Sequence, residues 1–104
     1  MARFVALYRM PDEGDPQPFL QAYRGTHLPL VAATPGLTAV EVSRVRRTVA
    51  GQPQLLMAVM HFTDERFKEA MASAQWAAAG RNLADIGGLD LVTMFTLEEP
   101  EVSA

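Results

Sequence analysis

The most apolar run in the chain is Leu55-Leu56-Met57-Ala58-Val59-Met60-His61-Phe62. Successive side chains of a strand point to opposite faces, and here both faces are apolar: Leu55, Met57 and Val59 lie on one, and Leu56, Ala58, Met60 and Phe62 on the other. A strand of this kind has to be covered on both faces. We therefore predict a central strand over residues 55–62.

Extended and helical segments surround this strand on both sides. The alternation of side chains predicts three more strands, over residues 3–10, 37–45 and 89–97. Polar residues interrupt the strand at 37–45, which is typical of a sheet edge. A first helix is predicted from Pro18 to His27, with a further turn through Ala33. A second helical region follows Thr63 and is capped again at Ser73, and the Gly87-Gly88 pair ends it.

The order of these elements is β-α-β-β-α-β. It predicts an α+β domain of the ferredoxin-like type, a four-stranded antiparallel sheet with both helices on one face. The first, third and last strands are apolar on the other face as well, and so large an apolar surface is rarely left in water. We therefore expect a homodimer in which two sheets pack face to face.

The segment Tyr23-Arg24-Gly25-Thr26-His27-Leu28-Pro29-Leu30 holds the strongest candidate for a reactive side chain. Because proline has no N–H and disfavours a helical residue before it, the first helix is expected to end or kink near His27. His27 follows Tyr23 by one turn, which puts both side chains on the inward face. There the helix dipole favours the imidazolium form and burial opposes it, so His27 is a tunable acid or base, or else a structural histidine bonded to a helix carbonyl.

Composition excludes several classes of function. The chain has 104 residues and no cysteine, and its formal net charge is −3. We expect one domain over residues 1–104, in the cytoplasm, with no membrane span and no nucleic-acid partner. The two histidines lie far apart and no acid stands at ligand spacing from either, so no metal site is predicted. No phosphate-binding loop is present, and no cofactor is expected.

Four segments together resemble the EthD family of the dimeric α+β barrel superfamily. They are Arg3-Phe4-Val5-Ala6-Leu7-Tyr8, the run from Tyr23 to Leu30, Pro35-Gly36-Leu37, and the stretch from Ser73-Ala74 to Ile86-Gly87-Gly88. The resemblance implies a ferredoxin-like protomer with paired sheets. It also implies that His27 matches the family's histidine at the end of the first helix, lining a cleft between the helices and the sheet.

Candidate site residues follow from these patterns. His27, Tyr8 and Tyr23 are the catalytic candidates, because a phenol and an imidazole can share a proton with an oxygenated ring. Trp76, His61 and Arg9 are candidates for substrate binding. The competing interpretation of the tyrosines, Trp76 and His61 is packing in the core, and that of Arg9 is a solvated charge. Glu41 is a weaker candidate, as a partner of His27.

The predicted function is a small-molecule enzyme similar to the EthD family. It would act on an aromatic, polyketide or lactone-like metabolite, by His27-assisted proton transfer or by cofactor-independent oxidation, as a monooxygenase-like oxidoreductase or as an isomerase or cyclase. One alternative is a non-catalytic protein that binds a small apolar ligand or assists an oxygenase. Another is a haem-binding or haem-degrading protein with His27 or His61 as axial ligand.

Overall fold

The computed structural model describes residues 1–104 and contains four strands and six helical segments. In chain order they are β1 (Ala2–Arg9), α1 (Gln17–Ala22), the π-helical segment η1 (Tyr23–His27), α2 (Leu28–Ala32), β2 (Leu37–Arg44), β3 (Gln54–Phe62), α3 (Asp64–Met71), α4 (Ala74–Asp85), the 3₁₀ turn η2 (Gly88–Asp90) and β4 (Val92–Leu97). No helix combines the length and the hydropathy needed to cross a bilayer.

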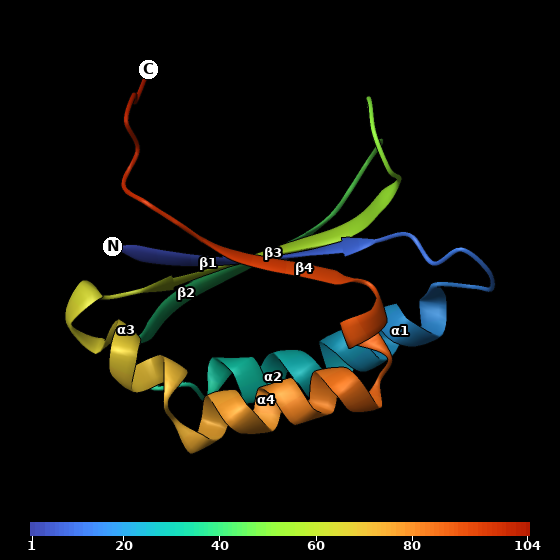
Figure 1. Cartoon of the computed structure of the whole chain (residues 1–104). Coiled ribbons are helices and arrows are strands. Elements are labelled where there is room, and N and C mark those ends of the chain that lie inside the picture. Colours follow the sequence, from blue (N-terminus) through green and yellow to red (C-terminus); the bar gives the residue numbers. More distant parts are fainter.

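The four strands form one antiparallel sheet in the order β2-β3-β1-β4, and all the helices lie on the same side of it (Figure 1). The predicted ferredoxin-like α+β fold is thereby confirmed. The apolar strand β3 is central, as predicted, and the more polar β2 lies at an edge.

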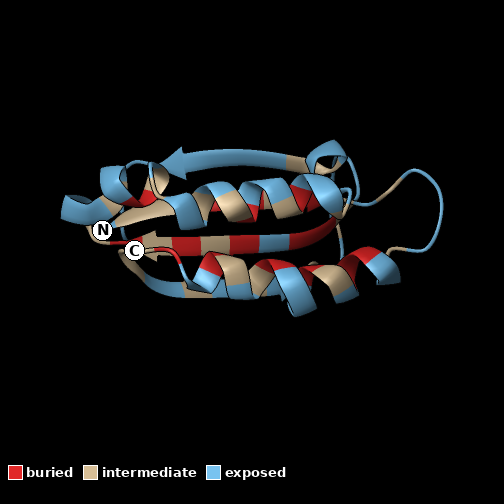
Figure 2. Cartoon of the chain, turned by 90° about the horizontal axis from the view of Figure 1, so that it is seen from below, coloured by how far each residue is buried: buried red, intermediate tan, exposed pale blue.

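The core lies between the sheet and the helices. On β1 the residues that point to the helices are Phe4, Ala6 and Tyr8, and they pair across the strands with Met60, Ala58 and Leu56 of β3. Seen from the helix side, the buried positions gather on the strand between the helices and on the helix surfaces that face it (Figure 2). Tyr8, Leu56 and Phe62 are among the largest fully buried side chains.

The opposite face of the sheet has no helix over it (Figure 1). Val5 pairs with Val59 and with Phe95, so the three side chains share this face. Several of its apolar residues are strongly exposed: Met57 by 40%, Phe95 by 40% and Leu97 by 42%. The loop between β2 and β3 and the chain after β4 both rise on this side. The sequence predicted an apolar second face, and the structure places it on the uncovered side.

The first helix is predicted to end or kink near His27, with a further turn through Ala33; in the structure it does not end there but continues through a π turn. The backbone N–H of Leu28 bonds to the carbonyl of Tyr23, five residues back, and α2 then runs on to Ala32. A regular α-helix would bring the Pro29 ring against the carbonyl of Gly25, and the wider turn relieves that clash. His27 is therefore inside a helical segment, and a dipole at a helix C-terminus does not act on it.

The last strand begins later than predicted. Gly87 ends α4 with a φ of +84°, in the left-handed region that favours glycine. The next residues form the turn η2, closed by a hydrogen bond of 3.0 Å from the Leu91 N–H to the Gly88 carbonyl. Leu89 lies in this turn and is 52% exposed, so it takes no part in the sheet. The other strand boundaries differ from the predicted ones by one residue.

Candidate functional site

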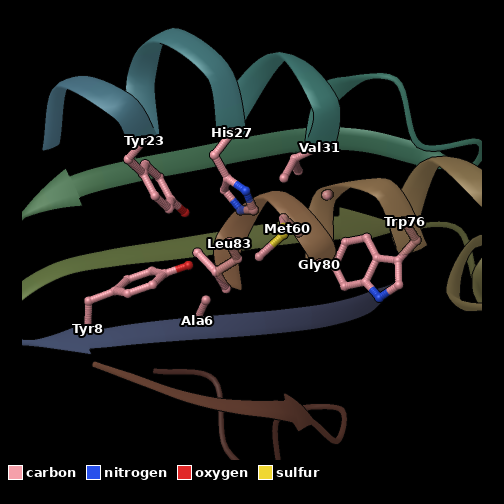
Figure 3. A pocket seen from close by; sticks show the side chains of 10 residues that line it. Ala6, Tyr8, Tyr23, His27, Val31, Met60, Trp76, Gly80 and Leu83 are labelled. Carbon is pink, nitrogen blue, oxygen red and sulfur yellow. The ribbon is translucent and has the colours of Figure 1, made fainter. Parts of the chain in front are cut away.

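A single cavity lies between the helices and the sheet, with a volume of about 70 Å³ (Figure 3). Its ten lining residues come from five elements: Ala6 and Tyr8 from β1, Tyr23 and His27 from η1, Val31 from α2, Met60 from β3, and Trp76, Ala79, Gly80 and Leu83 from α4. Apart from the two tyrosine hydroxyls and the imidazole, the lining is apolar. An apolar pocket with a few convergent polar groups is the usual form of a small-molecule site.

The sequence brings the lining side chains together by simple spacing. Tyr23, His27 and Val31 follow one another at intervals of four along the continuous helical segment. On α4 the spacing of three or four from Trp76 to Leu83 gives a second inward face, and that helix is capped by Ser73, whose hydroxyl accepts a hydrogen bond of 3.1 Å from the Trp76 N–H. The alternation of β1 adds Tyr8 from the sheet.

The polar groups of the cavity belong to a chain of aromatic contacts. The ring centroids of Tyr8 and Tyr23 are 5.2 Å apart at an interplanar angle of 75°, and those of Tyr23 and His27 are 4.9 Å apart at 40°. In Figure 3 the hydroxyl ends of both tyrosines point toward the space beside the His27 ring. One ligand oxygen could therefore meet a phenol and the imidazole together.

Burial keeps both phenols protonated. The pKa of Tyr8 is raised far above its ordinary value, mainly because burial disfavours the phenolate, and nearby Tyr23 adds to the shift. The pKa of Tyr23 is also raised by burial, although the Tyr8 hydroxyl opposes this in part. Both groups are therefore neutral at pH 7 and can donate a hydrogen bond to an oxygen in the cavity.

Burial keeps His27 neutral. The residue is only 5% exposed, and its pKa is lowered because desolvation of the imidazolium outweighs the opposing effects of the nearby Asn82 side chain and Ala79 carbonyl. Nδ1 is enclosed and has no hydrogen-bond partner, whereas Nε2 is not one of the enclosed unpaired atoms, and the residue lines the cavity. A neutral imidazole in an apolar cavity can accept a proton, so it has the protonation state of a general base.

The structure brings together four of the six predicted site residues: Tyr8, Tyr23, His27 and Trp76. Trp76 packs edge-on against Phe4 and Phe62, with centroid distances of 5.0 Å and 5.9 Å, and its inner side lines the cavity. It therefore both fills the core and faces the site.

His61 and Arg9 do not reach this cavity. His61 is on the alternation of β3 that points to the uncovered face, where its Nε2 lies 3.1 Å from the Oε1 atom of Glu41. The proposed pairing of Glu41 with His27 is therefore wrong. Arg9 donates a hydrogen bond of 3.0 Å to the Asp90 carbonyl and holds η2 against β1. Because both residues lie outside this cavity, their positions do not support the prediction that they bind substrate there.

Sequence reasoning missed Asn82, whereas it placed Gly80 or Ala79 on one helix face with Trp76 and Leu83. Asn82 follows Ala79 by three positions on α4, and this spacing was a signal that the two share a helix face. Gly80 is exposed and also lines the cavity, so it lies where the cavity opens to solvent. The structure contains no group of three or more acidic, cysteine or histidine residues that could hold a metal ion.

Solved structures resemble this chain over nearly its whole length. An ethyl tert-butyl ether D (EthD) family protein from Bacillus halodurans is 30% identical, with 96% of this chain and 99% of that chain covered and a TM-score of 0.83. SnoaB, a cofactor-independent oxygenase from Streptomyces nogalater, is 16% identical, with 97% and 94% covered and a TM-score of 0.63. A dimeric ferredoxin-like protein of unknown function from Jannaschia sp. CCS1 is 21% identical, with 94% and 99% covered and a TM-score of 0.63.

The last two similarities concern the fold alone, because their sequence identities are low. No family model matches the chain, and no curated protein matches it significantly.

The lowered pKa of His27 predicts a pH-dependent stability. The unfolded chain binds a proton at the ordinary histidine pKa of 6.5 and the folded chain only at lower pH. The free energy of unfolding should therefore fall as the pH drops below about 6.5, down to the lowered pKa of the folded state. Urea denaturation over a pH series measures this. His27→Gln should lose that part of the pH dependence and His61→Gln should keep it; equal slopes in the wild type and His27→Gln would contradict the assignment.

Gly80 offers a test of where the cavity opens. A Cβ atom at this position would meet no atom within 4 Å, and glycine inside a helix is less favourable than alanine by about 1 kcal/mol. Gly80→Ala should therefore stabilise the fold by up to about that amount, while its methyl group narrows the opening and weakens binding of phenol used as a probe. Thermal denaturation and NMR titration measure the two effects. Gly25→Ala, also free of contacts, is the control, and phenol binding should remain unchanged in it.

Proposed function

Because the chain belongs to the EthD family, as its 30% identity with the Bacillus halodurans protein over 96% of the chain shows, we propose that it is a small-molecule enzyme in which His27 acts as a general base. The observation that carries the proposal is the cavity itself: a buried neutral imidazole and two neutral phenols meet in an otherwise apolar lining.

The proposed reaction begins with proton transfer to His27. In this proposal the Nε2 atom takes a proton from a substrate hydroxyl or from a carbon next to a carbonyl group. The negative charge then rests on a substrate oxygen, as a phenolate or enolate. The hydroxyls of Tyr8 and Tyr23 donate hydrogen bonds to that oxygen, and the dry lining strengthens them. Return of the proton to a different substrate atom completes an isomerisation without any cofactor.

The same first step can serve an oxidation. An electron-rich carbanion formed by deprotonation can react with dioxygen, in which case the substrate supplies the electrons. SnoaB, which shares the fold, is a cofactor-independent oxygenase. We propose proton transfer as the common activity of the site, and oxygen uptake as the measurement that separates an oxygenase from an isomerase or cyclase.

The cavity volume limits the ligand to about one ring at most. An apolar cavity of about 150 Å³ is known to bind benzene, and the cavity here holds about 70 Å³. A single aromatic or lactone ring can enter with part of it in the opening beside Gly80. A fused-ring polyketide or a porphyrin is much larger than the cavity. We therefore favour a single-ring substrate over a polyketide, and we do not propose that His27 is an axial ligand of haem.

We further propose that the uncovered face of the sheet forms a homodimer, the dimeric α+β barrel arrangement. Its support is the exposed apolar surface that includes Met57, Phe95 and Leu97, together with the dimeric state of the Jannaschia protein of the same fold. In this arrangement the two cavities lie on the far sides of the paired sheets, so each site is built from one chain.

Replacement of His27 tests the proposed chemistry. A panel of single-ring phenols, enols and lactones is screened by NMR and by oxygen uptake. With the substrate so found, His27→Gln should lower kcat about 100-fold or more, because general acid–base groups contribute that much or more. His61→Gln, on the uncovered face, should keep full activity.

Unchanged kcat in a folded His27→Gln variant would refute the role of His27. If the wild type binds ligands from the panel but converts none of them, and His27→Gln binds them equally well, the non-catalytic alternative is the correct one. Ligand-induced thermal stabilisation measures that binding.

A charge on the uncovered face tests the dimer. The wild type should sediment as a dimer in analytical ultracentrifugation, and Met57→Glu should sediment as a folded monomer because two buried carboxylates would face an apolar partner. Leu89→Glu is the control: Leu89 is exposed but lies in η2, off the sheet, and its substitution should leave the dimer intact. A monomeric wild type would refute the arrangement.

A further inference from the structure

Two buried polar atoms near the cavity lack hydrogen-bond partners: Nδ1 of His27 and Oδ1 of Asn82. They belong to η1 and α4, two elements that pack against each other. An unpaired polar atom away from water is unfavourable, and two of them on neighbouring elements are best satisfied by one another. The Asn82 side chain lies near enough to the His27 ring to raise its pKa, so the two unpaired atoms are candidates for one hydrogen bond.

The direction of such a bond follows from the groups involved. The amide oxygen of Asn82 can only accept, so the proton has to come from the ring. The Ala79 carbonyl is the other acceptor near His27, but as part of α4 it belongs to a helical hydrogen-bond ladder, which satisfies one of its two lone pairs. Asn82 brings the acceptor that has no other partner.

The pKa of His27 agrees with this direction. The Asn82 side chain and the Ala79 carbonyl both raise the pKa of the ring, against the larger effect of burial. Acceptors act in this sense, because they favour the form in which both ring nitrogens carry protons. An amide N–H facing the ring nitrogen would act in the opposite sense.

We propose that Asn82 is a positioning residue, whose Oδ1 accepts a hydrogen bond from Nδ1–H of His27 and thereby directs the lone pair of Nε2 into the cavity. The neutral ring then exists mainly as the Nδ1–H tautomer. The opposite tautomer would present an N–H to the substrate and could not take a proton there. The catalytic meaning of this bond rests on the proposed function, but the bond and the tautomer do not.

NMR of ¹⁵N-histidine-labelled protein tests the tautomer directly. The chain has two histidines, so the spectrum contains two rings, and His61→Gln identifies the signals of His27. Above the pKa of the ring, the wild type should show His27 protonated on Nδ1 and unprotonated on Nε2. Asn82→Ala should shift the ratio toward the other tautomer and lower the pKa of His27, while the signals of His61 stay unchanged.

Asn82→Asp is the matched second variant, and it keeps the test valid if Asn82→Ala does not fold. A carboxylate keeps an acceptor at this position, so this variant should retain the Nδ1–H tautomer and raise the pKa of His27. A wild-type ring protonated on Nε2 would overturn the proposal, and so would a tautomer ratio unchanged in Asn82→Ala.

These outcomes are independent of those for the enzyme reaction. An inactive His27→Gln together with an Nε2–H tautomer leaves the proposed function standing and removes the role of Asn82. An active His27→Gln together with the Nδ1–H tautomer removes the proposed role of His27 in catalysis but leaves its hydrogen bond to Asn82 standing, as a structural pairing.

Discussion

The extra residue in the helical turn between Tyr23 and His27 is the constraint on which the site depends. A proline two residues after His27 would break a regular α-helix, but the wider turn lets the chain continue into α2. The imidazole is consequently held by helix on both sides, rather than at a frayed end. Within this turn, the hydroxyl of Thr26 donates a hydrogen bond of 2.8 Å to the Ala22 carbonyl. The continuous segment then brings Val31 to the same cavity as Tyr23 and His27.

Burial gives the three polar side chains complementary protonation states. Desolvation raises the pKa of each phenol and lowers that of the imidazole, so all three groups are neutral. A neutral base beside neutral donors is suited to a reaction in which charge appears only on the substrate. No charged residue lines the cavity, so the site has nothing that would bind an anionic ground state tightly. The donors favour the charge where it develops, which is how electrostatic preorganisation acts.

The sequence predicted the fold well, because alternation along β1 and β3 is a local signal: each residue of these strands lies on the face that its parity predicts. Helical spacing, another local signal, predicted that Tyr23, His27 and Trp76 lie on inward faces, and strand alternation put Tyr8 on one face with Phe4 and Ala6. The sequence predicted an end or a kink near His27 and a further turn through Ala33, but not the π turn that joins the two, since proline usually ends a helix. It also failed for Glu41, whose partner His61 is set by strand register, and for Asn82, whose place near His27 is set by the approach of two helices; a single sequence reveals neither.

The strand β1 carries two sets of residues with different duties. Ala6 and Tyr8 line the cavity, whereas Val5 and its neighbours across the strands lie on the uncovered face of the sheet. Since parity alone separates the two sets, a deletion of one residue near the start of β1 would exchange the faces of the residues after it, turning Tyr8 to the uncovered face and Leu7 to the cavity side. Substitutions can thus alter chemistry and assembly separately in evolution, but changes in the length of this strand cannot, and we expect β1 to be a segment in which related proteins tolerate no insertions or deletions.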